Sequence, residues 1–133
     1  QLEAADKINE KRLSIWNRYW DGLGKLSDEG KIVRPTIPEG CAHNAHMFYL
    51  KARDLEERTA LISYLKEQGV QAVFHYIPLH TAPAGRRYGM FAGEDRYTTR
   101  ESERLGRLPL YYNLSLEQAD YVIDKVNAFY KER

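Results

Sequence analysis

The chain has 133 residues, 43% of them hydrophobic and 29% charged, which fits one globular domain and excludes a disordered chain. Its 20 basic and 19 acidic side chains leave a net charge of +1, which gives no electrostatic reason to expect nucleic acid or an acidic membrane as a partner. The single cysteine, Cys41, excludes an internal disulfide and fits a reducing compartment, the cytoplasm. No apolar run approaches the roughly 18 residues of a membrane span.

The first 26 residues carry apolar side chains at close to helical spacing, and this pattern predicts one long helix. The aromatic stripe of Trp16, Tyr19 and Trp20 would pack either on the core of the same domain or on another domain or subunit. The helical pattern begins at the first residues, without a methionine or a capping residue. We therefore expect the chain to be part of a longer protein.

A strand, a helix and a second strand follow a connector that contains two prolines. The expected elements are a strand over 45–52, a helix from 55 to 68 and a strand over 70–76. Asp54 and Glu57 predict a capping box at the start of the helix, and Gly69 is placed to end it. If the second strand runs to its last residue, His75 and Tyr76 point to opposite faces of the sheet.

The segment 77–97 contains two prolines and three glycines and predicts a long loop outside regular structure. The aromatic and apolar residues of this segment argue against simple disorder. Loops of this length tend to be functional. Imidazole and phenol groups, as in the run from His75 to Tyr97, bind hydroxyl and phosphate oxygens and stack on rings. That combination favours a sugar or nucleotide ligand.

The remaining elements are helices and one extended piece. They are a short helix from Thr98 or Thr99, an extended segment over 107–112, and a last helix that begins at the capping box of Ser115 and Gln118. The sequence therefore predicts an α+β domain in which a small sheet of about three strands is covered by helices.

Two functions are open from the residues alone. One is a free-standing nucleotide- or sugar-binding module. The other is a small metal-binding domain, because the chain offers the zinc-type ligands Cys41, His43, His46, His75 and His80. Zinc needs three or four ligands that converge, and this spacing does not show that they do. Nucleophile-elbow, phosphate-loop and dinucleotide motifs are absent from the sequence.

Three segments of the chain resemble the C-terminal part of the DegT/DnrJ/EryC1/StrS sugar aminotransferases. They are AHMFYLKARD at 45–54, FHYIPLH at 74–80 and GEDRYTTRESERLGRLPLYYNLS at 93–115. The resemblance implies the small C-terminal domain of a type I transferase dependent on pyridoxal 5'-phosphate (PLP). It also implies that residues 1–27 form an interdomain helix and residues 77–97 an active-site loop.

The same resemblance implies partners and chemistry. The expected enzyme is a homodimer whose own N-terminal large domain holds PLP, and it moves an amino group from glutamate to a 4-keto sugar linked to dTDP. The chain has no segment like the PLP-lysine region of the family. We therefore expect this chain alone to bind no PLP, to contain no catalytic, cofactor-binding or metal-binding residue, and not to transaminate.

The expected site residues are substrate contacts. His75, Tyr76 and His80 match the family's H-Y-x-x-x-H segment at the mouth of the active site. Tyr88, Glu94 and Tyr97 join them by their position in the loop. Their expected role is to bind the sugar nucleotide and enclose it, while proton transfer belongs to a lysine in the large domain.

Overall fold

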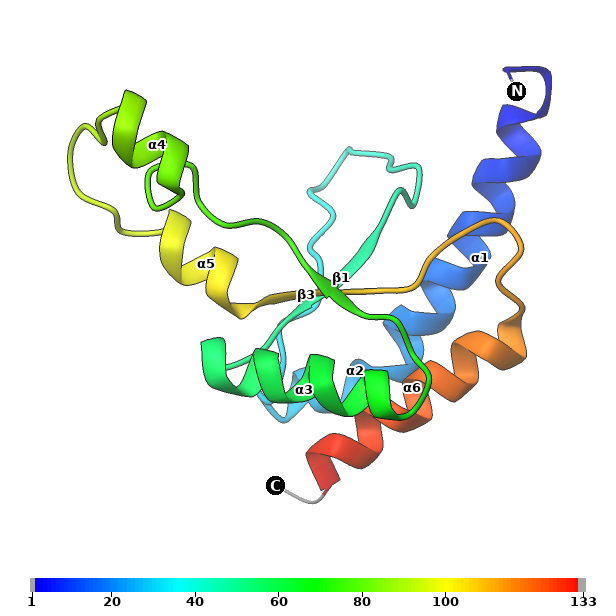
Figure 1. Ribbon diagram of the computed structural model, residues 1–133. Helices are drawn as coiled ribbons and strands as arrows, with labels where there is room; N and C mark the ends of the chain where they lie inside the picture. Colours follow the sequence, from blue (N-terminus) through cyan, green and yellow to red (C-terminus); the bar gives the residue numbers. More distant parts are fainter. Residues whose placement is uncertain (1, 132–133) are drawn as a thin grey trace.

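A three-stranded antiparallel sheet lies at the centre of the domain (Figure 1). The computed structural model describes residues 2–131. The strands are β1 (Phe48–Lys51), β2 (Val73–Phe74) and β3 (Leu105–Leu108), in the order β1-β3-β2. The predicted α+β class and the small sheet are confirmed.

The helices pack on one side of this sheet or project from its edge (Figure 1). They are the short 3-10 helix η1 (Leu2–Ala4), followed by α1 (Ala5–Gly22), α2 (Gly24–Asp28), α3 (Leu55–Glu67), α4 (Pro83–Tyr88), α5 (Thr98–Arg104) and α6 (Leu116–Lys131). Helices α1 and α6 pack against each other, and α3 contacts both α6 and β3. Helices α4 and α5 lie together in a segment that extends away from this helical layer. We call this segment, residues 77–104, the arm.

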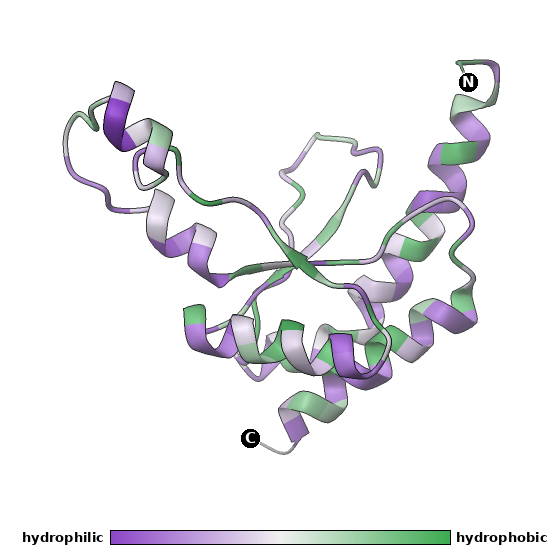
Figure 2. Ribbon diagram, in the orientation of Figure 1, coloured by the Kyte–Doolittle hydropathy of each residue, from purple (hydrophilic) through white to green (hydrophobic). Residues whose placement is uncertain are grey.

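One face of the sheet forms the core. Phe48, Leu50 and Leu108 alternate with solvent-facing residues along β1 and β3, and all three are buried. Phe48 packs against the rings of Trp16 and Tyr19, at centroid distances of 5.4 and 5.2 Å. The strands at the centre of the sheet are accordingly hydrophobic, whereas α4 and α5 are largely hydrophilic (Figure 2).

The aromatic stripe of α1 packs on the core of its own domain. Trp16 and Tyr19 are 5% and 0% exposed, and Trp20 stacks on Trp16 at 5.1 Å. The Tyr19 hydroxyl donates a hydrogen bond to the Pro109 carbonyl at 2.8 Å, so it fixes the chain just after β3. Burial raises the pKa of Tyr19, which keeps the hydroxyl a donor.

The predicted N-terminal helix is present but shorter than expected. Helix α1 ends at Gly22, Leu23 leaves helical geometry, and α2 resumes at Gly24. The free carbonyls at this end are satisfied by side chains from elsewhere: Arg34 donates to Trp20 and Asn127 to Gly22. These tertiary hydrogen bonds have no signal in the local sequence. Gln1 lies outside the described residues.

Three other expectations change. Residues 77–97 are not a loop throughout, because α4 forms within them with Pro83 in its first turn, where a missing N–H costs nothing. The second strand pairs only at Val73–Phe74, since Ala72 instead donates to the Val70 carbonyl in a turn. Strand β3 begins at Leu105 rather than 107 and ends before Pro109, which cannot donate to the ladder.

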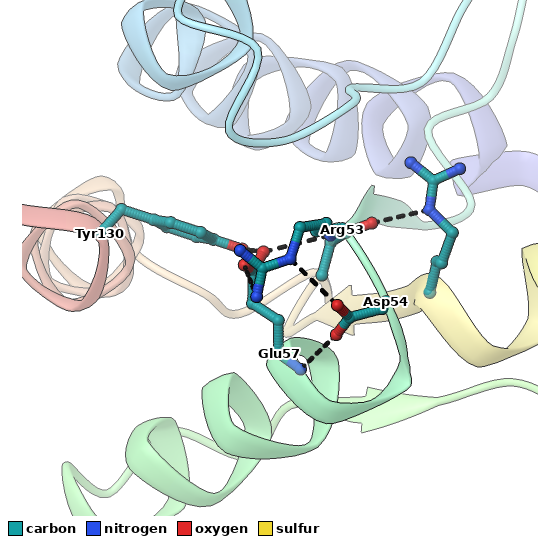
Figure 3. A network of polar contacts seen from close by, with 6 residues as sticks. Arg53, Asp54, Glu57 and Tyr130 are labelled. Carbon is teal, nitrogen blue, oxygen red and sulfur yellow. Dashed lines mark hydrogen bonds and ion pairs between the residues drawn. The ribbon is translucent and has the colours of Figure 1, made fainter. Parts of the chain in front are cut away.

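A polar network ties the start of α3 to α6 (Figure 3). Asp54 accepts the Glu57 N–H at 2.9 Å, as the predicted capping box requires. The Glu57 carboxylate accepts from the Arg53 N–H at 3.1 Å, one residue earlier than the motif expects, and from the Tyr130 hydroxyl at 3.0 Å. Glu57 is only 7% exposed, so these donors compensate for its burial. The second predicted box, between Ser115 and Gln118, forms in both directions.

The bond between Tyr19 and Pro109 should be measurable as stability. Tyr19→Phe removes a buried hydroxyl and leaves the ring, so we expect the free energy of unfolding to fall by about 1 to 2 kcal/mol. Tyr121→Phe is the matched control, because Tyr121 donates to the Gln68 carbonyl at 3.0 Å from a side chain that is 46% exposed. Urea unfolding followed by circular dichroism gives both values. Equal losses for the two variants would contradict the anchoring role of Tyr19.

Candidate functional site

The second face of the sheet is not covered as the core face is. By alternation along the strands it carries Tyr49, Lys51, Val73, Leu105 and Arg107, which we call the open face. None of these residues is buried, and Val73 is 39% exposed. Arg107 is central, because its partners across the sheet are Tyr49 on β1 and Val73 on β2.

His75 lies at the edge of the open face, directly after β2. Nη1 of Arg107 is 2.5 Å from Nδ1 of His75 and 3.4 Å from Nε2. Since a guanidinium only donates, Nδ1 must accept, and the neutral ring then carries its proton on Nε2. Burial and, secondly, the positive charge of Arg107 lower the pKa of His75, which favours this neutral form.

The predicted alternation of His75 and Tyr76 held only for a strand that includes both residues, and the structure does not form that strand. Strand β2 ends at Phe74, and strand alternation therefore does not apply to the next two residues. Instead the His75 and Tyr76 rings stack with centroids 4.2 Å apart and an interplanar angle of 17°. The backbone carbonyl of Tyr76 also accepts a hydrogen bond from the Ser102 hydroxyl on α5. Tyr76 is 73% exposed, so its ring is available to a ligand.

His80 belongs to a second cluster on the arm. Its Nε2 lies 2.8 Å from Asp95 Oδ2 and 3.3 Å from the Thr99 hydroxyl. Thr99 donates to the same Asp95 oxygen at 2.5 Å, and the His80 ring contacts Phe91 at 4.4 Å. Hydrogen bonds from Thr99 and then from His80 lower the pKa of Asp95. The cluster connects the chain before α4 to the start of α5.

The other predicted contacts lie apart from both histidines. Tyr88 and Tyr97 are 77% and 72% exposed, and Glu94 pairs with nearby Arg96 at 2.9 Å. Within residues 2–131, no hydrogen bond, ion pair or ring contact joins Tyr88, Glu94 or Tyr97 to His75 or His80. The structure thus brings His75 and Tyr76 together and places His80 in a separate cluster.

Three residues of these clusters were not predicted: Arg107, Asp95 and Thr99. Asp95 accepts the Thr99 N–H at 3.3 Å, but it lies before the N-cap residue Tyr97 and the four-residue spacing is not that of a helix cap, so the sequence carries little signal for this pair. Arg107 interrupts the otherwise apolar run LGRLPL. A charge in the middle of a short strand marks a residue that faces something other than the core.

Two of the hollows in the described part of the chain concern the sheet and its surroundings. One, of about 830 Å³, runs beside His75 and Tyr76 and is largely apolar; it is lined by Ile62, Ala72, Val73, Phe74, His75, Tyr76, Ile77 and Leu79. The second, of about 620 Å³, lies against α6, and we call it the α6 hollow. Its walls are Gly69, Val70, Gln71, Pro109, Tyr111, Leu114, Glu117, Gln118, Tyr121 and Val122. Only the first hollow contains predicted site residues.

The described residues offer no metal cluster. Between residues 2 and 131, no three histidine, cysteine, aspartate or glutamate side chains gather as metal ligands. Cys41 is exposed and pairs with no other cysteine. Among the helices of the same residues, none is both long and apolar enough to cross a membrane.

The model of the DegT/DnrJ/EryC1/StrS aminotransferase family matches residues 1–127. The chain belongs to this family. The histidine and tyrosine at 75 and 76 therefore sit in an aminotransferase domain, and the resemblance based on the three segments is confirmed at the level of the family.

Two relatives of this chain are named as sugar aminotransferases. The 3-oxo-glucose-6-phosphate:glutamate aminotransferase of Bacillus subtilis is 32% identical over 119 residues, which are 87% of this chain and 26% of that protein. The dTDP-3-amino-3,4,6-trideoxy-alpha-D-glucose transaminase of Micromonospora megalomicea subsp. nigra is 28% identical over 128 residues, or 95% of this chain and 33% of that protein. The chain spans between about a quarter and a third of the length of these relatives.

A solved structure similar to this chain shares its fold. NtdA from Bacillus subtilis with bound cofactor PMP superposes with a TM-score of 0.77 and 29% identity, covering 93% of this chain and 28% of that one. The predicted fold, a small domain of a PLP-dependent transferase with a long N-terminal helix, is confirmed.

The His80 cluster should hold the arm in place. Asp95→Ala removes the acceptor of both His80 and Thr99, so we expect faster backbone hydrogen exchange over residues 79–99. Glu94→Ala is the matched control, because Glu94 is exposed and pairs only with its near neighbour Arg96. Hydrogen exchange with mass spectrometry measures both variants. If Asp95→Ala exchanges over residues 79–99 no faster than Glu94→Ala does, the cluster does not hold the arm.

Proposed function

We propose that this chain is the substrate-facing small domain of a PLP-dependent enzyme that transfers an amino group from glutamate to a keto sugar linked to dTDP. The observation that carries the proposal is the pairing of His75 with Arg107 at the edge of the open face, within a domain of the sugar aminotransferase family. From the HYIPLH and ESERLGRLPLYYNLS segments, the finer assignment that we propose is a dTDP-4-amino-4,6-dideoxygalactose transaminase of enterobacterial common antigen synthesis.

The site chemistry supports a sugar nucleotide as the ligand. The neutral His75 ring can donate from Nε2 to a sugar hydroxyl or phosphate oxygen while Arg107 holds Nδ1. Tyr76 offers a ring face and a hydroxyl, and it lies beside the apolar hollow of about 830 Å³. Apolar walls with a few fixed polar groups are typical of small-molecule sites. A dTDP-linked sugar also appears in the name of one relative.

PLP is the cofactor that the family implies, but we propose that this chain alone does not bind it. PLP supplies the electron sink for amino transfer when it is bound, and it needs a lysine and an acidic partner for its ring nitrogen. The lysine on the open face, Lys51, is held by Glu101 at 2.6 Å, and Glu101 also pairs with Arg104 at 3.4 Å. We infer that the PLP lysine lies in a larger domain outside this chain, and that His75 and Tyr76 act on substrate only.

The arm favours a partner that lies against it. Leu79 and Met90 are 84% and 94% exposed, and Ile77 is 60% exposed, on a segment whose chain is otherwise fixed by the His80 cluster. Apolar side chains held out in this way are typical of an interface. We propose that the arm, including residues 77–97, closes over the active site of a cytoplasmic homodimer, and that residues 1–27 lead to its large domain.

The proposed function is tested with the protein that carries this domain. Supplied with PLP, glutamate and dTDP-4-keto-6-deoxy-glucose, it should form a dTDP-amino sugar, detected by mass spectrometry. The 133-residue chain alone should neither turn over these substrates nor develop the absorbance of a PLP–lysine adduct. An intact protein that aminates no nucleotide-linked keto sugar would remove the proposal, and turnover by the 133-residue chain would remove the two-domain account.

His75→Ala should affect sugar binding rather than the cofactor. We expect KM for the dTDP sugar to rise about tenfold, as for the loss of one hydrogen bond to a charged group, while PLP absorbance stays unchanged. His46→Ala is the matched control, since His46 is exposed and lies in neither histidine cluster. Steady-state kinetics and the visible spectrum separate the two effects. Loss of PLP with an unchanged KM for the sugar would show that His75 serves the cofactor instead.

A further inference from the structure

Arg107 stands at the centre of the open face without an anion to pair with. Among residues 2–131, no carboxylate lies within 4.0 Å of its guanidinium, and its Nε is buried without a hydrogen-bond partner. The only side chain that Arg107 contacts by hydrogen bonding in this part of the chain is the imidazole of His75. A buried donor without a partner, on a cation that faces only a neutral ring, lowers the stability of the fold.

The neighbouring cationic side chains, unlike Arg107, bind oxygen atoms of the protein. Lys51 and Arg104 share the Glu101 carboxylate, at 2.6 and 3.4 Å. Arg104 also donates to the Ala52 carbonyl at 2.8 Å, and Arg58 donates to the Glu103 carbonyl at the same distance. Each of these groups has an oxygen acceptor from the protein. Among residues 2–131, Arg107 therefore differs from these neighbours in lacking an oxygen partner, and the natural partner of a guanidinium is an oxyanion.

The position of Arg107 leaves room for such a partner. It lies on the middle strand, with Tyr49 and Val73 directly across on β1 and β2, and none of the three is buried. Arg107 does not itself line the apolar hollow of about 830 Å³, but its cross-strand partner Val73 and its hydrogen-bond partner His75 both do. A ligand that extends from that hollow past His75 would meet the exposed Tyr76 ring and the guanidinium of Arg107.

We propose that Arg107 binds an oxyanion of the substrate on the open face, with His75 as its positioning neighbour. This inference rests on the proposed function, which supplies two sources of the oxyanion: the diphosphate of the nucleotide sugar and the carboxylate of the amino donor. Either presents paired oxygens to the planar guanidinium fork, which lysine cannot match. Arg107 is thus a substrate-binding residue in addition to the histidine and tyrosine segment.

The test uses Arg107→Gln and Arg107→Lys in the protein that carries this domain, with KM measured separately for the dTDP sugar and for glutamate. We expect Arg107→Gln to raise one KM about 10- to 100-fold and Arg107→Lys to restore it only in part. An effect on the sugar KM identifies the diphosphate, and an effect on the glutamate KM identifies the carboxylate. Arg18→Gln is the control, because Arg18 lies on α1 and pairs with Asp120 at the surface. It should change neither KM.

Direct binding separates this inference from the proposed function. Calorimetric titration of dTDP, and of glutamate, into wild-type and Arg107→Gln protein needs no turnover. Weaker binding of one ligand to the variant, at an unchanged melting temperature, supports the inference even if no keto sugar is aminated. Unchanged binding of both ligands, with both KM values within twofold of wild type, overturns it. If Arg107→Gln lowers the melting temperature, Arg107→Lys provides the same comparison in a folded protein.

Discussion

The middle strand β3 decides what the rest of the domain can do. It pairs with β1 on one side and β2 on the other, and its alternation sends Leu108 into the core and Arg107 to the opposite face. The core face is fixed by Phe48, Tyr19 and the helical layer, and the Tyr19 hydroxyl holds the chain as it leaves β3. Because the helices occupy one face, the other is available for ligand binding.

The sequence predicts the parts of this arrangement that depend on local chemistry. The Asp54 cap of α3, the capping box of Ser115 and Gln118, and the left-handed Gly69 after α3 are confirmed, because such a cap requires only residues three apart. The short helix α4 was missed because Pro83 reads as a breaker, although a proline in the first turn is compatible with a helix. The break between α1 and α2 depends on Arg34 and Asn127, which local periodicity cannot reveal.

The candidate site was predicted in part for the same reason. His75, Tyr76 and His80 stand close in sequence and were found by their motif, but the motif does not say that His80 joins Asp95 rather than His75. The pairing of His75 with Arg107 joins residues 32 apart and appears only when β2 and β3 are paired. All six predicted substrate contacts remain predictions, and within residues 2–131 the structure links Tyr88, Glu94 and Tyr97 to neither histidine cluster.

The proposed enzyme would use the arm and the open face together against its large domain. His80, Asp95 and Thr99 fix the chain on which Leu79 and Met90 are exposed, so the apolar residues are presented by a braced segment. The proposed enzyme would place its cofactor domain against this surface and the sugar nucleotide between the two. In that arrangement the small domain supplies recognition, and the proton transfers belong to the larger one.

The most direct measurement of this account is hydrogen exchange of the protein that carries this domain, with PLP bound, in the presence and absence of the dTDP sugar. If the open face is the substrate face, exchange slows in residues 48–51, 73–80 and 105–108 when the sugar is added, and the α6 hollow is unaffected. Slower exchange confined to residues 69–71 and 117–122, which line the α6 hollow, would place the substrate elsewhere and contradict the account.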